Sequence, residues 1–359
     1  MRASGNIGEW SEPYVFLRLA ADGYIPNADK DMHPSMTEKL YIREVARDDV
    51  WVKVDNPLSF IRMAAYPHGG VARTCSVSEI SARADRLLSI IKNATGKISD
   101  GEFGSFLDSL GFRQLKNPVS RETRAQKKDI VLKIEDSRFG YPSLGFSVKS
   151  HLGGAPTLLN ASEATNIVYK VEGLNNEDVW RINSIDTRTK IQDRCAEIKR
   201  LGGVVSFDRF SSGRFEENLS IIDGDMPQII AEIVLRHYLE NEYSVDNLLS
   251  YVSALPRFSR RQIDFCKLKY KRFLRACALG LKPSDEWHDT DDATGGYITV
   301  LSDGGMMVFY IYDRALFDEY LFKNTKFERA STTRHGYMSL YTLDGKVYVK
   351  LNLQIRFIN

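Results

Sequence analysis

The sequence predicts a fold of the mixed α/β class, with α+β character, and three observations lead to that prediction. Residues 129–149 have the pattern of two strands joined by a turn, because apolar Ile130, Leu132 and Ile134 stand at alternate positions. Several other segments carry apolar residues at the three-to-four-residue spacing of amphipathic helices. After residue 296 the chain changes to short β-like runs separated by Gly-Gly and Asp-Gly turns.

The first third of the chain is expected to hold three helices and a strand meander. Residues 8–21 suit a helix, because Pro13 is tolerated in its first turns and Gly23 lies beyond its end. The expected meander covers residues 40–65, which are rich in β-branched and aromatic side chains. Two further helices are expected at residues 78–92 and 100–110.

A basic connector, residues 116–128, leads into the hairpin at residues 129–149. A break at residues 153–156 is followed by a short helix or ordered loop and then by a strand. One long helix is expected from residue 175 to 200. Beyond it the sequence predicts helices at 226–240, 244–254 and 259–279, then strands at 297–301, 306–312 and in two runs within 337–357.

Composition places the chain among globular proteins. It has 359 residues, of which 43% are hydrophobic, enough for two or three ordinary domains. Neither a run of about 18 apolar residues nor the apolar core of a signal peptide occurs, so a cytoplasmic protein is expected. Its cysteines form no CxxC pair and are expected to be buried or idle thiols; they are Cys75, Cys195, Cys266 and Cys277.

Charge is distributed unevenly along the chain. The formal net charge of +2 does not by itself indicate a nucleic-acid binder. Basic residues concentrate within residues 257–275, however, and acidic residues within 285–292. The basic segment coincides with a predicted helix and suits phosphate contact, although such a run is also typical of a solvated helix face.

The hairpin carries the candidate catalytic and metal-binding residues. Asp129 and Lys149 stand at its two ends and can therefore meet at one end of a sheet. Phosphodiester hydrolysis needs a hard cation held by carboxylates and carbonyls, and a positive group beside the attacking water. Asp129 is the candidate metal ligand, the backbone carbonyl of Val148 can complete the metal shell, and Lys149 is the candidate cation. A strand start and a solvated lysine are the plainer alternative.

This spacing resembles the PD-(D/E)xK nuclease core, with Asp129 as its acidic residue, Lys149 as its lysine, and Ser147 at the position where Asp or Glu usually stands. More specifically, the sequence resembles the HpaII-type restriction endonucleases. The matching stretches run from one end of the chain to the other: GNIGEWSEPYVFL, LGFSVKSHLGGAPTLLNASEATNIVY, NTKFERASTTRHGY and LNLQIRF.

The resemblance implies a type II restriction endonuclease that cuts double-stranded DNA with Mg²⁺ at a short palindrome, CCGG. The implied fold is a PD-(D/E)xK nuclease core, a mixed central sheet flanked by helices, with additional β-rich and helical DNA-recognition elements. Three segments are expected: a nuclease core at 1–175, a helical region at 176–280 and a β-rich recognition region at 281–359. A palindromic target favours a homodimer.

Ser147 departs from the nuclease motif, because a hydroxyl cannot replace the charge of a carboxylate metal ligand. Two sources of a further carboxylate are left open. Glu163 follows Lys149 by fourteen positions, as in some other CCGG-cutting endonucleases. Glu12 stands in the first helix in a G-x-x-x-E pattern that resembles the superfamily's auxiliary carboxylate, and Glu9 is its near neighbour.

DNA recognition is expected to use other residues. Asn160, Arg334 and His335 lie in blocks that match the family and are candidates for groove or backbone contact. His335 can also be read as a general base, a role that the metal mechanism does not require. Candidate phosphate contacts come from the basic segment, namely Arg260, Arg261, Lys271 and Arg272.

Other functions compete with this one. A nuclease-fold protein that binds DNA or RNA without cutting would also explain Ser147, and a nuclease for structured or damaged DNA is a third possibility. ATP-driven cleavage is unsupported, because no G-x-x-x-x-G-K-[ST] loop is present. Neither G-x-S-x-G nor H-E-x-x-H occurs, so the sequence points to no other kind of hydrolase.

Overall fold

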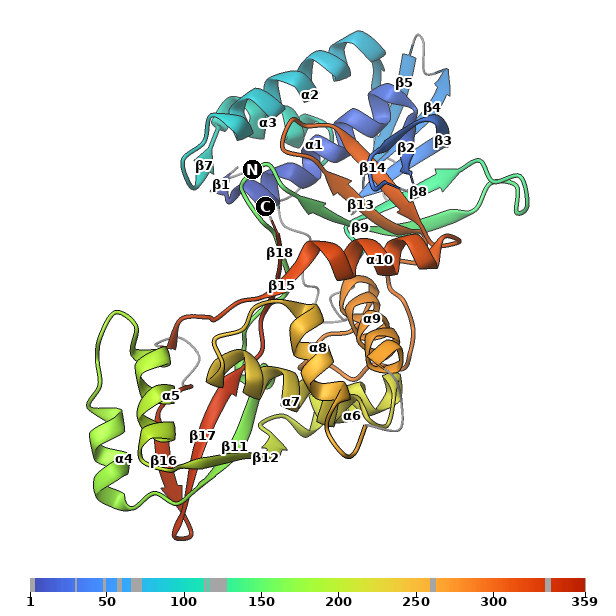
Figure 1. Cartoon of the computed structure of the whole chain (residues 1–359). Helices are drawn as coiled ribbons and strands as arrows, with labels where there is room; N and C mark the ends of the chain where they lie inside the picture. The colour runs from blue at the N-terminus through green and yellow to red at the C-terminus, as the bar shows by residue number, and fades with distance from the viewer. Residues whose placement is uncertain are drawn as a thin grey trace.

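The computed structural model describes residues 4–29, 31–47, 50–56, 60–65, 73–112, 115, 128–258, 263–332 and 337–358. Figure 1 shows two lobes, which we call the first and second lobe. The first holds the N-terminal helices and the largest sheet, and the second holds a smaller sheet and most of the remaining helices. Both chain termini lie near the waist between the lobes. The mixed α/β class is thus confirmed.

The first lobe is built on a nine-stranded sheet with mixed strand directions. The predicted hairpin forms its centre: β8 and β9 are antiparallel, with Ile130 opposite Phe146. Strand β9 pairs in parallel with β13, which places Lys149 opposite Thr299. In spatial order the strands are β2 (Tyr24–Ala28), β14 (Met306–Tyr310), β13 (Gly296–Val300), β9 (Ser143–Ser150), β8 (Ile130–Ile134), β3 (Pro34–Arg47), β4 (Val50–Asn56), β5 (Phe60–Ala65) and β6 (Arg73–Ser76).

The three predicted N-terminal helices are confirmed as α1 (Ile7–Asp22), α2 (Val77–Lys92) and α3 (Gly101–Ser109). Helix α1 begins with a capping box, in which the Asn6 side chain and the N3 residue Glu9 satisfy each other's backbone N–H groups. It ends where Gly23 adopts a left-handed conformation, φ 69°, that favours glycine. Trp10 and Phe16 are fully buried, so α1 belongs to the core of the first lobe.

The second lobe contains a four-stranded antiparallel sheet. Its spatial order is β12 (Val204–Phe210), β11 (Asn166–Glu172), β17 (Lys346–Asn352) and β16 (Leu340–Leu343). A second, three-stranded sheet has the order β10 (Thr157–Leu159), β18 (Ile355–Phe357) and β15 (Thr325–Phe327), and β1 (Ser4–Gly5) pairs with β7 (Ile98–Ser99). The remaining helices are η1 (Glu163–Thr165), α4 (Asn176–Asn183), α5 (Lys190–Arg200), α6 (Gly213–Ile222), α7 (Met226–Leu239), α8 (Val245–Ser253), α9 (Ile263–Leu279) and α10 (Arg314–Asn324).

The C-terminal segment is shared between the lobes. Ile298 and Val308, from β13 and β14, are buried in the cluster that contains Trp10, whereas Val349 and Phe357 belong to the second cluster. Buried residues of the C-terminal segment therefore belong to both cores. The strands at 296–310 complete the sheet that carries the predicted hairpin.

The prediction of one helix from 175 to 200 is wrong, because the structure has two helices there, α4 and α5. The guanidinium of Arg194, from α5, donates hydrogen bonds to the carbonyls of Asn183 (2.8 Å) and Ile185 (3.1 Å). It thereby satisfies backbone carbonyls that have no helical partner at the end of α4. The spacing of apolar residues in the sequence does not reveal such a side-chain contact. Strand β12 and helices α6 and α10 were also missed.

The predictions for the cysteines, the basic segments and membrane-spanning helices can be compared with the structure. All four cysteines are buried thiols outside any disulfide bond, as predicted. Most of the basic connector, residues 116–127, and residues 259–262 of the predicted basic helix lie outside the described residues. Within the described ranges, no helix is long and apolar enough to cross a membrane.

Candidate active site

A cleft of about 810 Å³ lies where the first turns of α1 face the ends of β8 and β9. Asp129, Lys149 and Glu12, predicted from distant parts of the sequence, line this one cleft. The hydroxyl of Ser11 links the two sides, because it donates to the Ile7 carbonyl and forms a second hydrogen bond with the Ser150 hydroxyl at 2.9 Å. Helix α1 is thus fixed against the strand that carries Lys149.

Asp129 stands directly before β8, at the point where that strand stops pairing with β9. Its Oδ2 accepts a hydrogen bond from the Val148 amide at 2.7 Å and another from the Ser147 hydroxyl at 3.3 Å. The Asp129 carboxylate therefore accepts the hydrogen bond that the Val148 amide of β9 would otherwise donate to a neighbouring strand. Ser147, the position that departs from the nuclease motif, orients Asp129 and is itself buried.

The carbonyl of Val148 faces the same side as the Val148 amide, because both backbone groups of one residue in a strand point the same way. Alternate residues bond to β13 instead, and this pattern continues directly after β9, where the His151 amide donates to the Val300 carbonyl at 2.9 Å. The Val148 carbonyl consequently points away from β13 and toward the Asp129 side, as expected for a candidate metal ligand.

Lys149 is half-buried and lines the cleft. Within the described part of the chain its ammonium group forms no ion pair. Desolvation raises the pKa of Asp129 above its ordinary value, and the positive charge of Lys149 is the largest influence that opposes this increase. A second cation or a bound metal would strengthen that opposing influence and favour the ionised carboxylate.

The two glutamates of α1 have different surroundings. Glu9 caps the helix, since its carboxylate accepts from the Asn6 amide at 2.9 Å. Glu12 lies one turn further along and is held by the buried Arg47 of β3, at 2.5 Å. The side chain of Glu12 is 18% exposed and lines the cleft with Asp129. The geometry thus separates a capping carboxylate from one that can serve the site.

Comparisons with known proteins identify the family of the chain. Residues 6–357 match the model of a family described as HpaII restriction endonuclease. The chain belongs to the HpaII restriction endonuclease family. It is 34% identical to the type II restriction enzyme HpaII of Haemophilus parainfluenzae, with 99% of each chain covered. No solved structure matches it.

The chain is therefore a type II site-specific endonuclease, a hydrolase whose substrate is double-stranded DNA. Such enzymes generally use a divalent metal ion. The residues of the cleft fit a hard cation, because Asp129, Glu12 and the Val148 carbonyl all offer oxygen ligands. Among the described residues no group of three or more His, Cys, Asp or Glu side chains forms a ready metal site.

The other predicted site residues of the endonuclease are dispersed. Asn160 is exposed and lines the cleft. Glu163 does not line it; this residue begins η1 and lines a separate pocket in the second lobe. The predictions for Arg260, Arg261, Arg334 and His335 lie outside the described residues.

The basic helix of the endonuclease, α9, uses most of its charge internally. Of its five cations, only Arg272 lacks an ion pair with the described residues; Lys271, for example, pairs with Glu319 of α10. The other paired cations are Lys267, Lys269 and Arg275. Figure 1 shows α9 packed beside α8 and α10. Stabilisation of the helix packing accounts for this charge run, and Arg272 remains a candidate phosphate contact.

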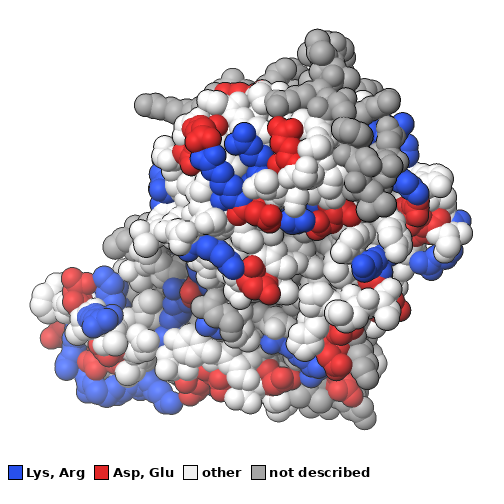
Figure 2. Space-filling model, turned by 90° about the horizontal axis from the view of Figure 1, so that it is seen from above, with Lys and Arg blue, Asp and Glu red and all other residues white. Residues whose placement is uncertain are grey.

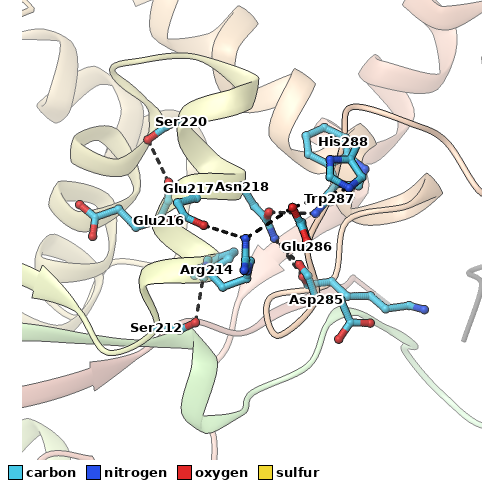
Figure 3. A network of polar contacts seen from close by, with 12 residues as sticks. Ser212, Arg214, Glu216, Glu217, Asn218, Ser220, Asp285, Glu286, Trp287 and His288 are labelled. Carbon is cyan, nitrogen blue, oxygen red and sulfur yellow. Dashed lines mark hydrogen bonds and ion pairs between the residues drawn. The ribbon is translucent and has the colours of Figure 1, made fainter. Parts of the chain in front are cut away.

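The acidic segment 285–292 is also part of the architecture. Asn218 of α6 donates to the carbonyls of Asp285 (2.8 Å) and Lys282 (3.2 Å), and its Oδ1 accepts from the Trp287 amide. Figure 3 shows this network, with Arg214 directed toward Glu217 and Glu286. The network fixes the segment that leads from α9 into β13.

Arg47 and Lys97 were missed from the sequence. Arg47 is fully buried at the end of β3 and reaches Glu12, a role that no local motif reveals. Lys97 is exposed and lines the same cleft. On the face seen in Figure 2, positive and negative side chains are interspersed, in agreement with the near-zero net charge.

Proposed function

We propose that this endonuclease hydrolyses double-stranded DNA at CCGG with Mg²⁺, using a PD-(D/E)xK-type site. The convergence of Asp129, Glu12 and Lys149 in one cleft carries the proposal. Asp129, Glu12 and the Val148 carbonyl would hold the metal. When bound, Mg²⁺ lowers the pKa of a water and neutralises charge on the phosphate.

The chain's own residues supply orientation and charge. Ser147 and the Val148 amide hold the Asp129 side chain in one orientation through its Oδ2, at the wall of the cleft. Arg47 holds Glu12 from the protein interior. The Lys149 ammonium, beside Asp129, orients the attacking water and stabilises negative charge on the phosphate oxygens.

Glu12 is the preferred source of the extra carboxylate that Ser147 cannot provide. Glu9 and Glu12 both line the cleft, but the Glu9 carboxylate is used as the N3 residue of a capping box, and Glu163 lines a different pocket. Exposed Asn160 and Lys97, on the cleft walls, are placed for contact with the DNA backbone. Arg272, Arg334 and His335 remain candidate DNA contacts.

We infer a homodimer on the DNA, because a two-fold palindrome matches two-fold protein symmetry. Each subunit would then cut one strand. Sedimentation of the protein with a CCGG duplex in Ca²⁺ should give a complex of two chains per duplex, and a single chain per duplex would contradict this inference.

The deciding experiment is digestion of a plasmid by the purified chain with Mg²⁺. Discrete fragments with ends at CCGG, abolished by EDTA, are expected. Equal cleavage of a CCGG-free duplex would instead favour an enzyme for other DNA structures. Salt-sensitive binding with intact DNA under every divalent metal tried would favour the inactive binder.

A further inference from the structure

The pocket that contains Glu163 lies on one face of the four-stranded sheet of the second lobe. It has a volume of about 410 Å³. Val168 of β11 stands opposite Arg209 of β12 and opposite Lys350 of β17. Residues opposite one another point to the same face of a sheet, so Arg209 and Lys350 flank Val168 on the pocket side.

The opposite face of this sheet is covered by protein. Ile167, Tyr169 and Val171 are buried there in the core of the second lobe, and the Tyr169 hydroxyl donates to the Ala231 carbonyl of α7 at 2.8 Å. The face with Arg209 and Lys350 is therefore the one turned away from α7. The Arg209 side chain is 47% exposed.

The pocket brings hydrogen-bond donors and an acceptor together. Glu163 is exposed, Lys350 is half-buried, and within the described ranges neither forms an ion pair. Arg209 lies over the ring of Tyr348, with 5.5 Å from its guanidinium carbon to the ring centre, and it pairs with Asp208. The stacked guanidinium is held at the pocket with its orientation restricted.

Glu163 is presented by a rigid element. The Asn352 amide group of β17 donates to the Ser162 carbonyl at 2.9 Å and to the Asn166 Oδ1 at 2.8 Å. Asn352 is 1% exposed, so these bonds are shielded from water. The turn that carries Glu163 is thus fixed to the same sheet as Lys350.

The pocket also lies close to the candidate active site along the chain. Asn160 lines the cleft and Glu163 lines the pocket. Three residues of extended chain span at most about 10 Å. Successive base pairs are about 3.4 Å apart, so this distance is about three steps of duplex DNA. DNA bound in the cleft can therefore place a base of the same short target near Glu163.

We propose that this pocket reads a G·C base pair of the target, with Lys350 donating to guanine O6 and N7 beside the stacked Arg209, and Glu163 accepting from the cytosine amino group. Those are the donors and acceptors that a G·C pair presents in the major groove. The inference rests on the proposed function, because it requires a target that contains G·C pairs. It makes Glu163 a specificity-determining residue of the endonuclease.

The test compares Glu163→Gln and Lys350→Gln in the full-length chain. Kd is measured with Ca²⁺ in place of Mg²⁺, for a CCGG duplex and for a duplex of equal length and composition without CCGG. The ratio of the two Kd values should fall by roughly 5- to 150-fold in each variant, as expected for the loss of one base contact. Glu177→Gln and Lys199→Gln, at exposed positions of α4 and α5, are the matched controls and should keep the ratio within about 2-fold of wild type.

Three results overturn the inference. An unchanged ratio shows that the pocket contacts no base. Equal weakening on both duplexes shows phosphate contact alone. Intact discrimination with loss of Mg²⁺-dependent cleavage in Glu163→Gln makes Glu163 a metal ligand instead. Failure of the wild-type chain to cut CCGG overturns the proposed function before any variant is compared, so the two failures are distinguishable.

Discussion

The Nη2 atom of Arg47 lies 2.5 Å from Oε2 of Glu12, which joins the end of β3 to the first helix at the wall of the cleft. The Arg47 side chain is fully buried, also donates to the Leu115 carbonyl, and lies 5.6 Å from the ring centre of Phe112. A carboxylate held from the interior by a buried guanidinium has few alternative rotamers. Glu12 is therefore held in one orientation at the wall of the cleft, where it and Asp129 could bind the same metal ion.

Replacing Glu12 should abolish most cleavage without abolishing DNA binding. Glu12→Gln is expected to lower the single-turnover rate at least about 100-fold, because a metal ligand loses its charge. Binding of a cognate duplex in Ca²⁺ should largely persist. Glu9→Gln is the matched control one turn away, and since its side chain acts in the helix cap it should retain near wild-type cleavage. Equal rates for both variants would contradict the assignment of Glu12.

Asp129→Asn should make the metal-free protein more stable at neutral pH while it removes activity. The pKa of Asp129 is raised in the folded chain by desolvation. As pH rises from the ordinary pKa through the raised one, the unfolded chain gives up its proton first, so folding stability falls and stays lowered at neutral pH. Asparagine can keep the hydrogen bond from Val148 and carries no charge to desolvate.

Thermal unfolding at pH 7 in EDTA measures this effect. The expected Tm of Asp129→Asn is above that of wild type, and Mg²⁺ should raise the wild-type Tm more than that of the variant. A lower Tm for the variant in EDTA would show that the carboxylate stabilises the fold, contrary to the direction of the pKa shift.

Local patterns in the sequence were sufficient for the hairpin and the first helix. Alternating apolar residues from Ile130 to Ile134 predicted β8, and the stop at Gly23 predicted the end of α1. The turn at Asp344-Gly345 likewise joins β16 to β17 as expected. In each case the determining interactions lie within one element or one turn, which is why a single sequence was enough.

Interactions between distant segments were not predictable in the same way. The split between α4 and α5 depends on where the Arg194 side chain folds back, and the parallel pairing of β9 with β13 joins residues about 150 positions apart. At the site, the roles of Glu9 and Glu12 could be separated only with Arg47 in place. Glu163 was a reasonable candidate by spacing, but spacing does not specify which pocket a side chain lines.

Lys149→Ala separates an enzyme from a protein that only binds DNA. Cleavage should fall about 100- to 1000-fold, as is typical when one group that stabilises developing charge is removed. Specific binding in Ca²⁺ should survive. Lys97→Ala, in the same cleft but exposed, should instead weaken binding to all sequences and reduce the salt slope by about 1. If cleavage persists in Lys149→Ala, the proposed role of the lysine is wrong.

Buried His237 should make the second lobe sensitive to mild acid. Burial lowers the pKa of His237 to about 4, and the ring Nδ1 lies 2.6 Å from the Glu242 carbonyl, to which it donates when protonated at that nitrogen. The unfolded chain binds a proton as pH falls below about 6.5, whereas the folded chain does so only near 4, so stability falls across that window. The loss contributed by this residue should reach about 3 kcal/mol.

Denaturant unfolding between pH 7 and pH 4 tests this in wild type, His237→Asn and His33→Asn. Asparagine at position 237 can donate to the same carbonyl but does not titrate, so this variant should be less stable at pH 7 and lose less stability on acidification. His33 is exposed, and His33→Asn controls for the removal of a histidine without burial. If the His237→Asn variant loses as much stability on acidification as wild type, another group is responsible for acid sensitivity, and the neutral imidazole at this position does not control it.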